Sequence, residues 1–290
     1  MINSSRSSNV KPTTKRRRAS LMNKKLRFPR NLWRHRELWW RLTEREILGR
    51  YRGSVLGIAW SFITPLAMLA VYTFVFSQVF KARWGGLEQA GPLGFAINLF
   101  AGLIVFNLFS ECAIRAPSLI VSNPNYVKKV VFPLDILSCV SVGNACFHAL
   151  TSLCILLIFE LIAFQTIPLT LLWLPLVWLP LILGSLACSW LLSSAGVFLR
   201  DIGQLIGVGI NMLMFLSPIF FPLSALPDRW QPLLRINPLA QVIEQTRRVA
   251  VQGVNPDWPY LLIGTVITLL ACEISFRGLQ RSKKAFADVL

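Results

Sequence analysis

The chain has 290 residues, of which 54% are hydrophobic and only 15% are charged. A soluble domain carries roughly 25% charged residues, so the composition argues against a soluble protein, and the mean hydropathy of +0.56 predicts an integral membrane protein. The net charge of +17 could suggest a nucleic-acid binder, but 16 of the 30 basic residues lie in segment 1–53. This uneven distribution is typical of membrane proteins, which keep positive charge on the cytoplasmic side, so no nucleic-acid partner is expected.

Segment 1–30 is rich in Ser, Asn, Arg and Lys and has no apolar run, so we expect a disordered, basic cytoplasmic tail. Segment 31–53 has a helical pattern with two distinct faces. At 100° per residue, one face holds Trp33, Trp40, Ile47 and Tyr51, and another holds Arg34, Arg41, Arg45 and Arg52. The pattern predicts an amphipathic helix in the membrane interface, although packing against cytoplasmic protein would use the same faces.

Segment 54–290 is expected to form one transmembrane domain. A span needs roughly 20 mostly apolar residues, and six apolar segments are long enough. They run near 55–80, 95–114, 137–163, 169–197, 202–221 and 259–276. Their continuous apolar runs favour helices over the alternating strands of a barrel. The predicted fold class is therefore an all-α integral membrane protein with six transmembrane helices.

The basic residues also predict how the spans are oriented. With a cytoplasmic N-terminus, the inside segments hold 24 Lys and Arg, and the outside segments hold 6. Since positively charged loops stay in the cytoplasm, both termini are expected there.

The three acidic residues within spans are Glu111, Glu160 and Glu273. An acid inside a membrane is a functional candidate by default. However, Arg115 and Arg277 stand four residues after Glu111 and Glu273, which predicts local i,i+4 ion pairs. A proton or ion relay is therefore only weakly supported.

Segment 222–258 lies between the last two spans and is too rich in Pro and charged residues to cross the membrane. Its short apolar runs predict two helices, near 227–235 and 239–251. Asn237 is expected to cap the second one, because Pro238 follows it and suits a first helical turn.

The second of these helices has an apolar stripe, because Leu239, Val242 and Ile243 recur at i, i+3 and i+4 and must be buried. The two helices either dip into the outer leaflet as re-entrant elements or belong to a structured extracellular loop. If the two helices are re-entrant, Leu233, Leu239 and Ile243 are the candidates for an outer gate, a closure at the outer side of the membrane.

Motifs for chemistry are absent from the sequence. None of the nine lysines follows a glycine, so a Walker A P-loop is excluded. No GxSxG occurs, and the six cysteines form no CxxC pair. We therefore expect a chain that is not an enzyme, with no catalytic residues, no metal and no cofactor of its own.

Six short motifs lie between residues 37 and 280. They are 42–47 (LTEREI), 50–57 (RYRGSVLG), 60–66 (WSFITPL), 122–134 (SNPNYVKKVVFPL), 198–202 (FLRDI) and 237–239 (NPL). These motifs resemble the permease subunits of polysaccharide-exporting ABC transporters, the type that exports O-antigen, lipopolysaccharide or capsule. The long basic tail is a departure that the resemblance does not cover.

The resemblance implies a homodimer of six-span permeases in the bacterial inner membrane, with two copies of a separate cytoplasmic ABC ATPase that binds ATP and Mg²⁺. The substrate would be a polysaccharide such as O-antigen, often linked to a lipid. The resemblance also implies contact between the ATPase and the loops after the second and fourth spans. The coupling candidates are Asn123, Pro124, Lys128, Lys129, Phe132, Pro133, Arg200 and Asp201.

A glycan path is expected to have aromatic and small polar residues along it, because sugar rings offer apolar C–H faces edged by hydroxyls. Such residues share faces on the first and fifth spans. The candidates are Phe62, Thr73, Phe76 and Phe80, then Asn211 and Phe215. Ordinary helix packing or contact with lipid would produce the same pattern.

Three other functions compete with glycan export. A permease of the same architecture could carry capsule, teichoic acid or a small lipophile. A secondary transporter or channel would have an internal repeat and central ionisable residues, and the sequence has neither. A membrane enzyme acting on lipid-linked sugars would need paired carboxylates or an acidic metal site, and none is visible.

Overall fold

The computed structural model describes residues 27–75, 91–128, 132–223 and 227–289. Every regular element in these ranges is a helix, as the continuous apolar runs predicted. Among the described residues, four helices are long and apolar enough to cross a membrane. They are α5 (Gly91–Arg115), α8 (Asp135–Phe164), α9 (Leu174–Phe198) and α13 (Trp258–Val289). The predicted second, third, fourth and sixth spans correspond to these helices.

The described parts of the predicted first and fifth spans contain shorter helices, and residues 76–80 of the first span lie outside the described residues. The 3-10 helix η1 (Gly57–Ala59) leads into α4 (Trp60–Thr73), and α10 covers Ile202–Phe215. α10 has 14 residues, which gives a length of about 21 Å at 1.5 Å per residue. The hydrocarbon core is about 30 Å thick, so α10 alone does not span it. A count of six crossings therefore stays a prediction.

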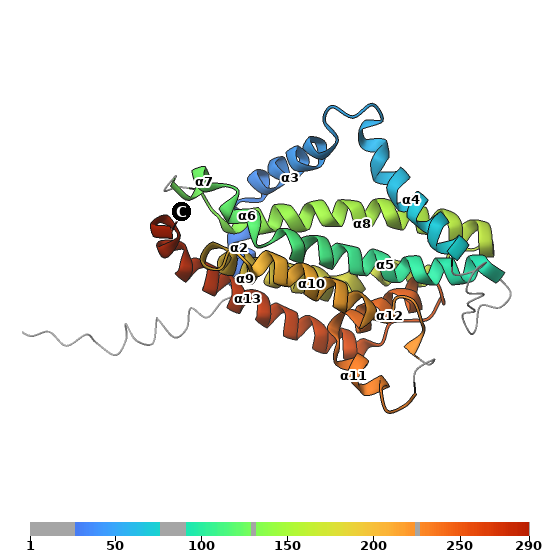
Figure 1. Cartoon of the computed structure of the whole chain (residues 1–290). Helices are drawn as coiled ribbons and strands as arrows, with labels where there is room; N and C mark the ends of the chain where they lie inside the picture. The colour runs from blue at the N-terminus through green and yellow to red at the C-terminus, as the bar shows by residue number, and fades with distance from the viewer. Residues whose placement is uncertain (1–26, 76–90, 129–131, 224–226, 290) are drawn as a thin grey trace, which may run out of the picture.

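The long helices lie side by side, with α5 enclosed by its neighbours (Figure 1). α5 contacts α4, α8, α9, α10 and α12, while α9 packs along α13. One close contact depends on a glycine: a Cβ at Gly196 in α9 would lie 2.2 Å from the carbonyl oxygen of Pro117. Small residues allow helix backbones to approach in this way.

The elements separate into two ends (Figure 1). The helices α6 (Ser118–Val121) and α7 (Pro124–Lys128), the start of α8 and the C-terminal end of α13 gather at one end. The helices α11 (Gln231–Ile236) and α12 (Pro238–Ala250) lie at the other. The described parts of the predicted cytoplasmic segments 115–136 and 277–290 therefore lie away from the predicted outer segment.

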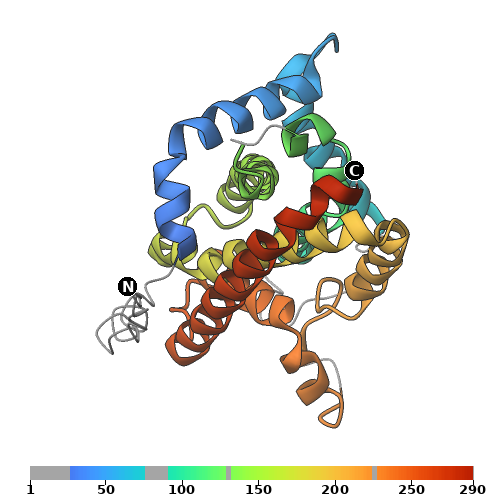
Figure 2. The same cartoon turned by 90° about the vertical axis from the view of Figure 1, so that its left-hand side faces the viewer.

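Two helices occupy the region where the sequence predicted one interface helix over 31–53. They are α2 (Arg27–Arg34), which begins inside the predicted tail, and α3 (Arg36–Tyr51). Figure 2 shows them bending around α8, which is seen end on. Trp33 and Trp40 are 71% and 64% exposed, so neither side chain packs into the helix bundle.

A different face of α3 packs against α8. Nε1 of Trp39 donates to the carbonyl oxygen of Cys139 at 2.9 Å. Thr43 is buried, and a Cβ at Gly143 would lie 2.9 Å from its methyl group. The helix therefore both packs on protein and leaves Trp40 exposed, so the two alternatives drawn from the sequence are compatible.

Candidate functional site

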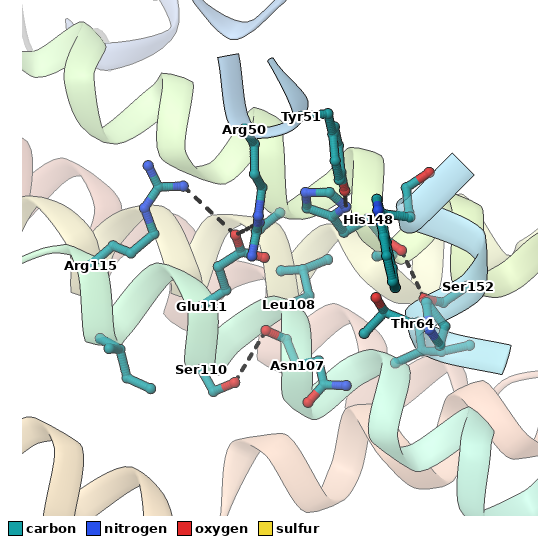
Figure 3. Close-up of a pocket in the computed structure, with 17 residues that line it drawn as sticks. Arg50, Tyr51, Thr64, Asn107, Leu108, Ser110, Glu111, Arg115, His148 and Ser152 are labelled. Atoms are coloured by element: carbon teal, nitrogen blue, oxygen red, sulfur yellow. Dashed lines mark hydrogen bonds and ion pairs between the residues drawn. The ribbon is translucent and has the colours of Figure 1, made fainter. Parts of the chain in front are cut away.

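A cavity of about 480 Å³ lies between α3, α4, α5 and α8 (Figure 3). Ile104 and Leu108 of α5 and Ala145 and Ala149 of α8 give it a buried apolar wall. Polar side chains contribute most of the remaining lining: Arg50, Tyr51, Ser61, Thr64, Asn107, Ser110, Glu111, Arg115, His148 and Ser152. Small-molecule sites have volumes of about 300–1,000 Å³, so the cavity is large enough for a small ligand.

Glu111 is the centre of a charged network beside this cavity. Its Oε1 accepts from Nη1 of Arg50 at 2.7 Å and from Nδ2 of Asn144 at 3.0 Å. Nη1 of Arg115 lies 3.7 Å from the same oxygen, and Nη2 of Arg115 pairs with Glu46. The predicted i,i+4 pair is present, but Arg50 of α3 is the nearer partner. The charge of this intramembrane acid is therefore compensated from two helices.

A second contact joins α3 to α8 across the cavity, because the hydroxyl of Tyr51 lies 3.4 Å from Nδ1 of His148. Burial raises the pKa of Tyr51; Arg50 opposes the rise and Glu111 adds to it. The phenol is therefore neutral at pH 7 and is available for hydrogen bonding. Nε2 of His148 is buried and has no hydrogen-bond partner within the described ranges.

The sequence did not predict this network as a site. It identified Glu111 as an intramembrane acid and gave it only the local partner Arg115. The sequence did not indicate which distant residues pair with each other. Arg50 and Glu111 are 61 residues apart in the chain, and Tyr51 and His148 are 97 residues apart. Only the packing of α3 over α5 and α8 brings these side chains together.

The coupling candidates of the first loop lie at the end that holds α6 and α7. α7 begins at Pro124, directly after Asn123. Nδ2 of Asn123 donates to the carbonyl oxygen of Leu119 at 2.9 Å, which fixes the turn before α7. Lys128 is exposed at the end of the helix, and Lys129 lies outside the described residues.

Contacts tie this loop to two other helices. The rings of Tyr126 and Phe132 stack with centroids 4.2 Å apart. Nη2 of Arg45 in α3 donates to the hydroxyl of Tyr126 at 3.3 Å. Nζ of Lys283 in α13 donates to the carbonyl oxygen of Phe132 at 3.0 Å. A displacement of the loop would therefore act on α3 and α13 as well as on the adjoining α5 and α8.

The remaining coupling candidates lie nearby in the fold. Pro133 lies two residues before the first residue of α8 and is half-buried. Arg200 and Asp201 form the exposed turn between α9 and α10. α6 packs against α9, so this turn and the first loop belong to the same end of the molecule.

The described path candidates lie on α4 and α10. Phe62 is 44% exposed and Phe215 is 68% exposed, and Asn211 is also exposed. Thr73 is half-buried and donates to the carbonyl oxygen of Leu69 at 2.6 Å. Phe76 and Phe80 lie outside the described residues.

The outer segment contains the two predicted short helices, α11 and α12. Oδ1 of Asn237 accepts from the backbone N–H of Leu239 at 3.0 Å, so the predicted N-cap is present. The apolar stripe of α12 is buried, as predicted, where this helix packs against α5 and α9. Its residues are Leu239, Val242 and Ile243. Leu233 belongs to α11, but its side chain lies outside the described set.

Arg247 continues the same stripe, and the sequence analysis did not single it out. The side chain is fully buried. It donates to the carbonyl oxygens of Asn98 at 3.0 Å, Pro218 at 2.6 Å and Ile219 at 2.9 Å. Burial lowers its pKa to about 10, so the guanidinium is still charged at pH 7. A charged residue four positions after Ile243 was the signal available in the sequence.

Comparison with known proteins agrees with this architecture. Residues 37–250 match the family described as ABC-2 type transporter. The chain is 26% identical to the O-antigen export system permease protein RfbA of Myxococcus xanthus over 91% of its own length and 99% of that protein. It is 24% identical to the protein of the same name from Klebsiella pneumoniae, over 86% and 93%. It is 25% identical to the polysialic acid transport protein KpsM of Escherichia coli, over 78% and 86%.

The family match covers most of the chain, and the described helices are long and apolar enough for several membrane crossings. The chain is therefore a multi-pass membrane protein that belongs to the ABC-2 type transporter family.

Proposed function

We propose that this chain is the transmembrane subunit of an ATP-driven exporter that moves a polysaccharide of the O-antigen type across the bacterial inner membrane. The observation that carries the proposal is the near full-length similarity to proteins named as O-antigen export permeases. The absence of a P-loop from the sequence agrees with a subunit that relies on a separate ATPase.

In this proposal six helices cross the membrane and both termini are cytoplasmic. The four long helices supply four crossings, and the segments 55–80 and 202–221, which contain α4 and α10, supply the other two. The placement of α11 and α12 at the end opposite α6 and α7 supports this orientation (Figure 1). The burial of α12 between α5 and α9 supports its assignment as a re-entrant element in the outer leaflet.

The complete transporter is proposed to contain two copies of this chain and two copies of an ABC ATPase, which holds the ATP and Mg²⁺. The docking surface is formed by α7, the turn at Arg200 and Asp201, and the segment around Phe132. Exposed Lys128 can pair with an acidic partner surface, while the Tyr126–Phe132 stack keeps the loop compact. The bonds from Arg45 and Lys283 pass a movement of this loop to α3 and α13.

The glycan path is proposed to follow the exposed faces of α4 and α10 and to be closed at its outer end by Leu239 and Ile243. Phe62, Asn211 and Phe215 are accessible on these faces, and aromatic rings can stack against sugars. A closed outer gate is needed because an open path of glycan size would leak ions.

Deletion and complementation in the source bacterium test the proposal. Loss of the chain should remove the polysaccharide from the cell surface while the finished glycan accumulates in the cell, and complementation should restore export. O-antigen and capsule should be measured separately, because the similarity to the polysialic acid transport protein favours capsule as a second candidate substrate. Normal amounts of both polymers at the surface would contradict the proposal.

A further inference from the structure

We infer that the cavity between α3, α4, α5 and α8 binds a sugar phosphate, the group at which a glycan is joined to a phosphorylated lipid. The inference rests on the proposed export of a lipid-linked glycan. It assigns recognition of the anchor to a site within one copy of the chain, separate from the proposed path along α4 and α10.

Two arginines supply the phosphate-binding part of the site. Arg50 and Arg115 approach the same carboxylate and both line the cavity (Figure 3). A guanidinium has five N–H donors. Contacts within the described ranges use one terminal nitrogen of Arg50 and two of Arg115. The remaining donors can bind phosphate oxygens, and the two side chains are 51% and 34% exposed, so a ligand can reach them.

The acidic partners position these arginines. Glu111 and Glu46 balance the two guanidinium charges, which would otherwise repel each other at this separation. The lining of the cavity itself holds two arginines, Arg50 and Arg115, and one glutamate, Glu111. A phosphate group therefore enters a region of positive potential.

The opposite part of the cavity suits a sugar ring. Trp60 offers an aromatic surface that is 43% exposed. The hydroxyls of Thr64 and Ser152 and the amide of Asn107 provide donors and acceptors for sugar hydroxyls (Figure 3). Nε2 of His148 is buried without a partner among the residues that the structure describes. Such groups are usually satisfied, by protein, water or a ligand.

The position of the cavity favours a ligand attached to a lipid. It lies beneath the turn between α3 and α4, where Gly53 and Gly57 adopt φ values of +85° and +52°. Val55 and Leu56 in this turn are 101% and 50% exposed, which fits insertion into the membrane interface. A lipid can therefore place its headgroup in the cavity and leave its tail among the surrounding lipids.

Binding is tested with the full chain in nanodiscs of phosphatidylcholine and with glucose 1-phosphate as the probe, measured by saturation-transfer NMR titration. We expect glucose 1-phosphate to bind at least ten-fold more tightly than glucose or inorganic phosphate. Equal affinity for inorganic phosphate would overturn the assignment of a sugar, and the absence of any binding would overturn the site.

Three variants localise the binding. Arg50→Gln should weaken probe binding at least ten-fold. Arg52→Gln is the matched control, since it removes a guanidinium two residues away that does not line the cavity, and it should bind as the parent chain does. Thr64→Val replaces a hydroxyl by a methyl group of the same size and should weaken binding about three-fold without changing thermal stability. Equal binding by all three variants would overturn the site.

A second lipid composition separates the two sources of phosphate. In nanodiscs that contain phosphatidylglycerol, unchanged probe affinity supports a site for the glycan anchor. Loss of probe binding there would show that a membrane phospholipid fills the cavity and would overturn the assignment. Since no ATPase or export is involved, a chain that exports glycan but binds no probe contradicts this inference alone. A chain that binds the probe but exports nothing contradicts only the proposed function.

Discussion

Arg247 holds α12 to α5 and to the segment after α10 through three backbone carbonyl oxygens. We expect Arg247→Met to destabilise the chain by about 3 kcal/mol, because buried acceptors lose a charged donor. The measurement is thermal unfolding in detergent. Arg248→Met is the control, since Nη2 of Arg248 makes an exposed hydrogen bond to Asn255 at 3.3 Å. Equal melting temperatures for the two variants would show that Arg247 is not a structural anchor.

Gly196 lies where α9 closely approaches the backbone of Pro117, just before α6. We expect Gly196→Ala to lower the melting temperature, because the added Cβ would meet the backbone of Pro117 at 2.2 Å and a backbone cannot rotate away. Gly207→Ala is the matched control, since a Cβ there has no neighbour within 4 Å. It should be neutral or stabilising by up to about 1 kcal/mol, as alanine favours helix more than glycine does. The prediction fails if both variants melt alike.

At this scale the sequence predicted local features better than distant pairs. The Asn237 N-cap and the i,i+4 pairs at Glu111 and Glu273 depend only on spacing, and all three are present. The contacts of Arg50 and Arg247 depend on how separate helices pack, and no short-range pattern encodes that.

Among the elements, the loop that contains α7 has the most specific expected role. We predict that Phe132→Ala and Lys128→Glu lower export while the chain still inserts and folds. The first removes the stack with Tyr126, and the second reverses an exposed charge on the proposed docking surface. Lys284→Glu on α13 is the control, because it reverses another exposed charge outside the proposed contact. The measurements are surface polysaccharide and the amount of ATPase that co-purifies. Unchanged export and association in both loop variants would remove the coupling role.

The outer helix α12 is tested by labelling single cysteines in a background without other cysteines. Leu239→Cys and Ile243→Cys should resist an impermeant thiol reagent at rest, because both positions are buried, whereas exposed Asp228→Cys should react. Reaction that increases during ATP-driven export would support a gate. Uniform labelling at rest and during export would instead indicate a plain extracellular loop.

Helix existence was predictable because apolar length is a strong signal, and the second, third, fourth and sixth predicted spans correspond to long helices. The exact residues at which helices begin and end were not predictable from apolar length. The interface helix divides at His35, and α10 ends at Phe215, six residues before the predicted span does. Both differences lie where tertiary packing competes with local apolar pattern.

For the whole molecule, hydropathy predicted a multi-pass membrane protein, and this agrees with its family. The cytoplasmic position of the basic segments stays a prediction. Hydropathy and charge could not predict that α9 packs along α13 or that α3 covers α8. Composition does not show which apolar helix face packs against which other face. The 480 Å³ cavity is a product of that arrangement, so it was outside the reach of sequence patterns.

In the proposed function, the chain carries polysaccharide across the membrane while another subunit binds and hydrolyses ATP. Inverted vesicles that contain the chain and its ABC ATPase should accumulate labelled lipid-linked glycan when ATP is added. Vesicles with the chain alone should neither hydrolyse ATP nor accumulate glycan. ATP hydrolysis by the purified chain, or ATP turnover by the complex without glycan entering the vesicles, would contradict the claim.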